Sequence, residues 1–258
     1  MSAHSLSTIR PASSNDLPRL QVNHLSVRYR EIWALEDVTV SLRPGRLTGI
    51  IGPNGAGKST MMRAMLGLVA GEGSVSWGSE PLLAERKRLA YLPQRNQIDW
   101  SYPATAWDVV MMGQVRKTGW FRRFSATSKA KAREALARVE MNDFADRPIG
   151  CLSGGQQQRI FLARALAQGA DALFLDEPFT GVDKRTETIL FSILRELVCE
   201  GKIVLVVHHD LGEAIQNFDD LILLNKNLIA CGPRKHVLQD EPMQRAYGGY
   251  VSFLPQVA

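Results

Sequence analysis

Cysteine is scarce in this sequence of 258 residues, which contains only Cys151, Cys199 and Cys231. The three lie far apart, and no two of them form a Cys-x-x-Cys pair. This spacing argues against the disulfide framework of a small secreted domain and against a zinc site, and it suits a reducing compartment. The five histidines are also scattered, apart from the adjacent pair His208-His209.

Long apolar runs are absent as well. The stretch Ile203–Val207 is among the longest, and it is far shorter than the roughly 20 residues of a membrane-spanning helix. The N-terminus lacks the basic-then-apolar pattern of a signal peptide. Residues 1–18 are rich in Ser, Pro and Asn, and this composition predicts a flexible leader.

Neither charge dominates the chain, since the net charge is +5. Hydrophobic residues make up 45% and charged residues 22%, which is ordinary for a globular domain long enough to bury a full core. The small basic excess suits polyphosphates or an anionic membrane surface. Because no long block of Lys or Arg is present, we expect no nucleic acid as a partner.

A glycine-rich stretch organises the rest of the chain and fits the pattern Gly, four residues, Gly-Lys-Ser/Thr. It consists of Gly52, Pro53, Asn54, Gly55, Ala56, Gly57, Lys58, Ser59 and Thr60. An apolar strand at 47–51 precedes it and a predicted helix at 60–68 follows it, which is the context of a phosphate-binding loop. Backbone N–H groups at a helix N-terminus can face a polyphosphate, Lys58 can meet its β- and γ-phosphates, and Ser59 can hold Mg²⁺.

A second motif places two carboxylates at the end of a buried strand. Residues 172–175 are apolar and lead into Asp176 and Glu177. Because the carboxyl ends of parallel strands share one edge of a sheet, we expect both carboxylates beside the phosphate loop. Asp176 can hold Mg²⁺ directly or through water, and Glu177 can polarise a water for in-line attack on a γ-phosphate.

A third motif opens a predicted helix and contains Ser153, Gly154, Gly155 and Gln156. Donor groups at a helix N-terminus form a second anion site. One chain does not need two such sites for one ATP. We therefore expect this site to face the γ-phosphate of a partner copy in a head-to-tail dimer.

Together these residues resemble the ATP-binding cassette (ABC) ATPases, over about residues 20–232. Residues 52–60 resemble the family's Walker A loop, 173–177 its Walker B strand and 152–156 its signature loop. Four further positions resemble the adenine-stacking aromatic residue, the Q-loop glutamine, the D-loop aspartate and the switch histidine: Tyr29, Gln94, Asp183 and His209. The resemblance implies ATP and Mg²⁺ as cofactors, with Gln94 sensing Mg²⁺ and His209 contacting the γ-phosphate.

The resemblance also implies an α/β fold, that of a P-loop NTPase, with a mostly parallel core sheet, an antiparallel β-layer and an inserted α-helical lobe. Alternating or short apolar stretches early in the chain agree with such a β-layer. We expect an ATPase domain at residues 19–258, with the helical lobe at about 95–168. Residues 128–139 predict an amphipathic helix of that lobe with a solvated charged face.

The segment after Gln94 indicates a subfamily. Residues 98–103, 108–113 and 119–123, in a stretch that also contains the aromatic residues Trp100, Tyr102 and Trp107, resemble the ATPases of bacterial manganese, zinc or iron(II) importers. This implies a multi-span membrane permease docked near Gln94–Trp107 and, indirectly, a substrate-binding protein. It also implies an ATP-dependent homodimer, peripheral on the cytoplasmic face of a bacterial inner membrane. Packing inside the helical lobe is the simpler role for these aromatic residues.

Two alternatives stay open at this point. The same chemistry would serve the ATPase of a siderophore importer, another importer or an exporter, and a soluble ABC ATPase could act on nucleic acid or ribosomes. The room between Gln94 and Ser153 fits only a compact lobe, which disfavours relatives with long coiled coils. The transported ion cannot be read from this chain, because the selectivity residues lie in other subunits.

Overall fold

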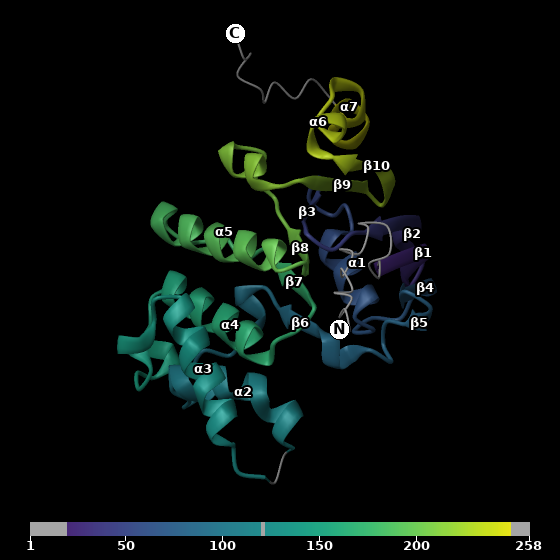
Figure 1. The fold of residues 1–258 in the computed structure, drawn as a ribbon. Helices are drawn as coiled ribbons and strands as arrows, with labels where there is room; N and C mark the ends of the chain where they lie inside the picture. Colours follow the sequence, from purple (N-terminus) through teal and green to yellow (C-terminus); the bar gives the residue numbers. More distant parts are fainter. Residues whose placement is uncertain (1–19, 120–121, 249–258) are drawn as a thin grey trace, which may run out of the picture.

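The computed structural model describes residues 20–119 and 122–248, and these residues form two β-sheets, the smaller of which lies at the right of the view in Figure 1. The predicted leader at 1–18 and the pair Trp120-Phe121 lie outside the described residues. The larger sheet has six strands in the order β10-β9-β3-β8-β7-β6. They are β3 (Arg46–Ile51), β6 (Leu89–Leu92), β7 (Ala172–Asp176), β8 (Ile203–Val207), β9 (Asp220–Asn225) and β10 (Asn227–Pro233).

Neighbouring strands of the larger sheet run parallel, except in the β9-β10 hairpin. The hairpin turns at Lys226, which adopts a left-handed φ of 63°. Every residue of β7 and β8 is buried, as expected for continuous apolar strands covered on both faces. The expected mostly parallel core sheet is therefore confirmed.

The smaller sheet is antiparallel, in the order β2-β1-β4-β5. Its strands are β1 (Leu20–Tyr29), β2 (Ile32–Leu42), β4 (Glu72–Trp77) and β5 (Glu80–Pro81). Helix α1 (Lys58–Met65) buries Met61, Met62 and Met65 in a core cluster with residues of both sheets. This arrangement confirms the expected antiparallel layer and attaches it to the helix of the phosphate loop.

Helices cover the other face of the larger sheet (Figure 1). Helices α4 (Gly154–Gln168) and α5 (Lys184–Cys199) lie against its strands, and α6 (Arg234–Val237) and α7 (Asp240–Tyr247) contact β9 and β10 in the tail. Helices α2 (Ala106–Thr118) and α3 (Ala126–Arg138), which lie between β6 and β7 in sequence, pack on α4. Short 3-10 turns occur at Arg86–Arg88, Arg95–Gln97, Asn142–Phe144, Ile149–Cys151 and Glu213–Asn217. Leu173 and Leu175 face the helices, whereas Phe174 packs towards α1, so successive residues of β7 serve two core clusters.

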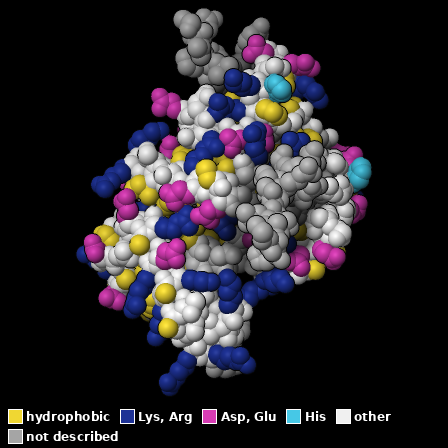
Figure 2. All heavy atoms as spheres, in the orientation of Figure 1, with side chains coloured by type: hydrophobic (Ala, Val, Ile, Leu, Met, Phe, Trp, Pro, Cys, Tyr) yellow, Lys and Arg dark blue, Asp and Glu magenta, His cyan; other side chains and the backbone are white. Residues whose placement is uncertain are grey.

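Helices α1 and α3 begin two residues earlier than the sequence predicts. Gly57, in the left-handed region at φ 91°, ends the phosphate loop and lets α1 begin at Lys58. Ser125 accepts a hydrogen bond from the Ser128 N–H at 3.0 Å and so starts α3 at Ala126. The charged side chains of α3 lie on its solvated face, as predicted, and Figure 2 shows Lys and Arg gathered at the lower end of the view, over α2 and α3.

None of the helices in the described ranges combines the length and the apolar character that crossing a bilayer requires.

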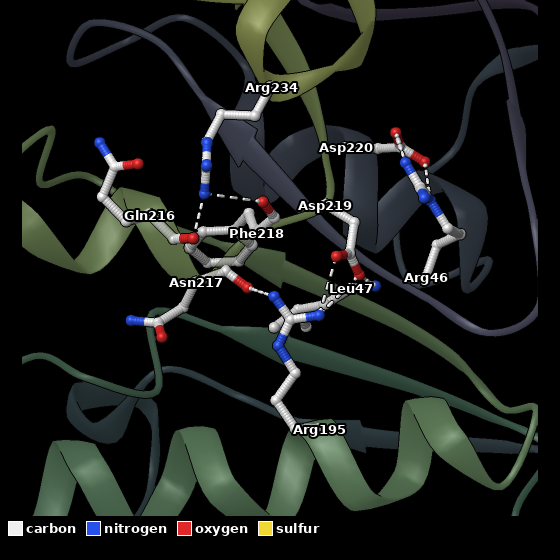
Figure 3. Close-up of polar contacts among 9 residues, drawn as sticks. All are labelled: Arg46, Leu47, Arg195, Gln216, Asn217, Phe218, Asp219, Asp220 and Arg234. Carbon is white, nitrogen blue, oxygen red and sulfur yellow. Dashed lines mark hydrogen bonds and ion pairs between the residues drawn. The ribbon is translucent and has the colours of Figure 1, made fainter.

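A polar network fixes the end of the larger sheet opposite the phosphate loop (Figure 3). Arg46, at the start of β3, donates to the two carboxylate oxygens of Asp220 at 3.0 and 2.6 Å. Asp219 accepts from Arg195 of α5 and from the Leu47 N–H, both at 2.8 Å. Burial alone would raise the pKa of Asp219, but these hydrogen bonds outweigh it and lower the pKa. The network therefore holds β3, β9 and α5 in a fixed arrangement.

Candidate functional site

The carboxyl ends of four parallel strands bring many of the predicted site residues together. Strand β3 leads into the phosphate loop at Gly52, β8 towards His209, β7 into Asp176 and Glu177, and β6 towards Gln94. Because β3, β8, β7 and β6 are neighbours in this order, their ends line one edge of the sheet. Residues far apart in sequence thus meet near the N-terminus of α1, where a polyphosphate is expected to bind.

Lys58 reaches back along the phosphate loop. Its ammonium donates to the carbonyl oxygens of Gly52 at 2.8 Å and Pro53 at 2.9 Å. Burial lowers the pKa of Lys58, while the charges of Glu177 and Asp176 act in the opposite direction. Two of the three ammonium hydrogens are engaged in this way, so one remains for an anion in the loop.

Two glycines of the loop are required by their surroundings. Gly52 has φ 148°, and a Cβ there would lie 2.1 Å from the carbonyl oxygen of Leu224 in β9. Gly57 has φ 91°, and a Cβ there would lie 2.4 Å from the carbonyl oxygen of Ala34 in β2. A side chain at either position would displace a strand. The loop is therefore held between the two sheets.

Ser59, Asp176 and Gln94 form a polar cluster beside the loop. The Ser59 hydroxyl donates to Asp176 Oδ1 at 2.7 Å, and Gln94 Nε2 lies 3.5 Å from Ser59 Oγ. Asp176 is fully buried, and its Oδ2 makes no hydrogen bond within the described part of the chain. Burial raises the pKa of Asp176, and the Ser59 hydrogen bond partly offsets this rise. A hydroxyl, an amide and a buried carboxylate with one unused oxygen are a donor set that fits Mg²⁺.

Glu177 follows β7 in an uncommon backbone conformation. Its φ of 52° is left-handed, and such strain in a residue with a side chain is concentrated at active sites. The Glu177 N–H donates to the Val207 carbonyl of β8 at 3.2 Å, which stabilises this conformation. Glu177 Oε2 accepts from the Thr180 hydroxyl at 3.3 Å. The negative charge of this carboxylate also opposes the lowering of the Lys58 pKa that burial causes.

The adjacent histidines after β8 have different surroundings. His208 is buried, and its ring packs against Phe179 and Phe218 with centroid distances of 5.6 and 5.5 Å. Burial lowers the pKa of His208 to about 4, so the ring is neutral at pH 7. His209 is exposed. The accessible member of the pair is therefore His209.

The buried His208 makes stability depend on pH. Its folded pKa lies below the value of about 6.5 for an unfolded histidine, so protonation favours the unfolded chain. The contribution of neutral His208 to the free energy of unfolding is therefore fully present above about pH 6.5. As the pH falls through about 4 this contribution, about 3 kcal/mol in total, is lost.

We expect the free energy of unfolding of His208→Phe, whose ring suits the aromatic contacts, to depend less on pH between pH 7.5 and 4.5 than that of the wild type. Denaturant titrations measure this dependence, with His209→Phe as the exposed control. Equal slopes for His208→Phe and wild type would contradict the expectation.

The signature residues and the D-loop aspartate lie at helix N-termini and not at the strand ends. Ser153 and Gln156 close a capping box: the Ser153 N–H donates to Gln156 Oε1 at 2.9 Å, and the Gln156 N–H donates to Ser153 Oγ at 3.3 Å. A Cβ on Gly155 would lie 2.9 Å from the Thr186 hydroxyl. Asp183 caps α5 and accepts from the Thr186 N–H at 2.8 Å. The two motifs therefore share Thr186.

Tyr29 lies at the turn between β1 and β2, where it pairs with Ile32. The tyrosine is 48% exposed and Ile32 is 68% exposed. Two residues further along β2, Ala34 touches Gly57 of the phosphate loop. An exposed aromatic ring in this place can stack on a nucleotide base.

Two residues outside the sequence motifs also contact the site. Tyr247 of α7 lies beside Gly52: burial raises the pKa of its phenol to about 12, and a hydrogen bond from the Gly52 backbone acts against that rise. Arg95 donates to Gln157 Oε1 from Nε at 3.2 Å and from Nη2 at 3.0 Å. No pattern in the sequence marks Tyr247, and Arg95 is marked only by its position next to Gln94.

An apolar groove of about 320 Å³ opens beside the Q-loop. Its lining includes Ile98, Trp100, Tyr102, Val109, Met112 and Phe161. Trp100 is half-buried and packs edge-on against Phe161 at 5.2 Å, so it contributes to the core of the helical lobe. Tyr102 and Met112 are 60% and 45% exposed. The segment near Gln94–Trp107 therefore presents both packing residues and exposed apolar residues.

The chain is similar to known proteins in sequence and in fold. A family model described as "ABC transporter" matches residues 35–180, which include the phosphate loop, Gln94, the signature residues and both carboxylates, while Tyr29, Asp183 and His209 lie outside the match. The "Manganese transport system ATP-binding protein MntB" of Listeria innocua is 46% identical over 230 residues, which are 89% of this chain and 96% of that protein.

The "Zinc transport system ATP-binding protein TroB" of Treponema pallidum is 48% identical over 234 residues, 90% of this chain and 88% of that protein. Among solved structures, a dimeric bacterial ABC transporter cassette superimposes with a TM-score of 0.73. It is 27% identical and covers 83% of this chain and 98% of its own. The expected fold class is confirmed by this likeness.

Proposed function

The chain belongs to the ABC transporter family, and from this premise we propose that it is the ATP-hydrolysing subunit of an importer for a divalent metal ion. The observation that carries the proposal is the single sheet edge where the phosphate loop, Asp176, Glu177 and Gln94 meet. The relatives named for manganese and zinc transport support the choice of cargo. Manganese, zinc or iron(II) would cross the membrane in another subunit.

Nucleotide binding follows from the geometry of the loop. The triphosphate would lie against the backbone N–H groups of residues 52–60, with the free Lys58 hydrogen directed to a phosphate oxygen and Tyr29 stacked on adenine. Ser59 and Asp176 would hold Mg²⁺, with Gln94 next to them. Mg²⁺ supplies charge neutralisation at the β- and γ-phosphates.

Hydrolysis needs a base and a stabilised γ-phosphate. We propose that Glu177 accepts a proton from the attacking water as the water oxygen bonds to the γ-phosphorus and the bond to ADP breaks. Lys58 would offset the charge on the γ-phosphate oxygens, and His209 would contact the γ-phosphate. The left-handed backbone at Glu177 is the feature that singles this residue out from its neighbours.

Two copies would cooperate in this reaction. Head-to-tail pairing would place Ser153, Gly154, Gly155 and Gln156 of one copy against the γ-phosphate held by the other, with Asp183 at the shared boundary. The 27% identical cassette described as dimeric supports this arrangement. ATP closes the pair and hydrolysis releases it, and this cycle would drive the permease between inward- and outward-facing states.

The permease would dock in the apolar groove beside Gln94, on the cytoplasmic face of a bacterial inner membrane. A substrate-binding protein would act through the permease and not through this chain. The proposal treats residues 19–258 as the ATPase domain and about 95–168 as its helical lobe. Purification of the tagged chain from detergent-solubilised membranes tests the assembly, since recovery with ribosomes or nucleic acid in place of a multi-span protein would overturn it.

The exposed wall of the groove predicts which side chain anchors the permease. Tyr102→Ala should weaken the complex by about 2 kcal/mol, or roughly 30-fold, because exposed aromatic residues often dominate such interfaces. ATP hydrolysis by the isolated chain should be unchanged, because Tyr102 lies outside the nucleotide site.

Titration of detergent-purified permease, measured by surface plasmon resonance, gives the affinities of the wild-type and Tyr102→Ala chains for the permease. Leu83→Ala, an exposed apolar residue outside the groove lining, is the matched control. A Tyr102→Ala chain that binds as tightly as the control would show that the groove is not the docking site.

A further inference from the structure

Arg95 connects two parts of the protein that lie on either side of it in space. On one side its guanidinium donates twice to Gln157 Oε1, at 3.2 and 3.0 Å, in the first turn of α4. It also packs against Gly154, where a Cβ would be only 3.1 Å from Arg95 Cζ. Gln157 is itself buried and donates to the Ile149 carbonyl at 3.1 Å. Arg95 therefore contacts the signature loop (residues 152–156) at Gly154 and the helix that follows it at Gln157.

On the other side Arg95 contacts Trp100, which lines the apolar groove. The Trp100 indole N–H donates to the Arg95 carbonyl at 3.0 Å, and the guanidinium lies 5.8 Å from the centre of the indole ring. The Trp100 carbonyl packs against Gly150, where a Cβ would be 2.6 Å away. Movement of Trp100 would therefore shift Arg95 and the turn before the signature loop together.

We propose that Arg95 is a positioning residue that sets the signature loop for the partner's ATP and transmits the state of the groove to it. Its neighbour Gln94 lies 3.5 Å from Ser59, in the nucleotide site of its own chain. The dipeptide Gln94-Arg95 then connects the groove to both ATP sites of a pair: Gln94 to the site of its own chain, Arg95 to the site of the partner. The inference rests on the proposed head-to-tail dimer.

The physical basis is the pairing of a charged donor with a buried acceptor. Such hydrogen bonds are strong, and their loss leaves Gln157 Oε1 without this partner. Glycine at 154 leaves the guanidinium room to lie on the backbone, so the signature loop and Arg95 move as one unit. Methionine at position 95 would keep the length of the side chain and remove both hydrogen bonds.

The test measures dimerisation with Mg-ATP in a Glu177→Gln parent chain by analytical ultracentrifugation. Arg95→Met should weaken the dimer about tenfold. Binding of Mg-ATP to the monomer should be unchanged, because Lys58 and Ser59 are intact. Arg95→Lys should recover part of the loss, since it keeps a charged donor but not the paired contact.

A double-mutant cycle then tests the connection to the groove. Trp100→Phe keeps a ring but removes the N–H bonded to Arg95, and it should weaken the dimer several-fold in the parent and not further in Arg95→Met. The control cycle makes the same two changes, Arg133→Met and Trp107→Phe, in an Arg-Trp pair on the helical lobe with the same 5.8 Å separation. Neither control change should affect the dimer.

The outcomes separate the inference from the proposed function. Additive effects of Arg95→Met and Trp100→Phe, or a dimer of unchanged strength in Arg95→Met, would overturn the role proposed for Arg95 and leave the proposed function untouched. A loss of monomer ATP affinity or folding in Arg95→Met that accounts for the weaker dimer would also overturn it. A parent chain that stays monomeric with Mg-ATP would overturn the paired mechanism and this inference with it.

Discussion

Replacement of Glu177 by Gln should give a chain that binds Mg-ATP and hydrolyses it about 10²–10⁴ times more slowly than wild type. Glutamine keeps the shape of the side chain and can still accept the Thr180 hydrogen bond, but it cannot take the proton of the attacking water. Binding should survive because Lys58, Ser59 and Asp176 are unchanged. Removal of a negative charge near the triphosphate should favour the closed pair, which we expect to accumulate.

Phosphate release and size-exclusion chromatography with Mg-ATP measure both effects. Glu187→Gln is a matched control, because this carboxylate pairs with Lys184 at 3.0 Å in the first turn of α5 and has no part in the proposed chemistry. Near-normal turnover in Glu177→Gln would remove Glu177 as the base.

Asp176→Asn should impair the site in a different way. Asparagine has the same shape, but it lacks the charge that the buried carboxylate offers to Mg²⁺. We expect affinity for Mg-ATP to fall at least about tenfold, as changes around a metal commonly cost that much. Affinity for ATP in EDTA should not fall, because removal of a buried negative charge near the phosphates lessens repulsion.

Isothermal titration of ATP with and without Mg²⁺ separates these effects. Wild type should bind more tightly with Mg²⁺, and Asp176→Asn should lose that difference. Parallel losses in Mg²⁺ and in EDTA would show that the substitution disturbs folding around β7 and would contradict the metal role. The two variants can therefore be told apart: Glu177→Gln is defective in turnover, and Asp176→Asn is defective in Mg²⁺-dependent binding of ATP.

The parts of the fold that depend on local patterns could be predicted from the sequence. The stretch from Gly52 to Thr60 specifies its own turn, and the apolar runs of β7 and β8 specify strands buried on both faces. Alternation along an extended strand also predicts that His208 and His209 face opposite sides, and the structure places one buried and one exposed.

Helix starts were less predictable because single capping residues decide them. The sequence predicts that α3 begins at residue 128, but the helix begins at Ala126 because Ser125 accepts a hydrogen bond from the Ser128 N–H. An isolated Ser in a polar stretch does not reveal in the sequence that it will act as a cap.

Contacts between distant segments could not be predicted, because they depend on how elements pack. Arg95 and Gln157 are 62 residues apart, and their hydrogen bonds exist only because the turn after β6 lies against α4. Tyr247 reaches Gly52 only because α7 packs near β9. Neither side chain belongs to a motif with a fixed spacing, so a single sequence carries no signal for these contacts.

ATP-driven metal uptake tests the central claim most directly. The chain and the permease that co-purifies with it would be reconstituted in vesicles, and accumulation of radioactive Mn²⁺, Zn²⁺ or Fe²⁺ would be followed with the substrate-binding protein supplied. We predict uptake with Mg-ATP in wild type and none with Glu177→Gln. Hydrolysis by the wild-type complex without accumulation of Mn²⁺, Zn²⁺ or Fe²⁺ would contradict the account.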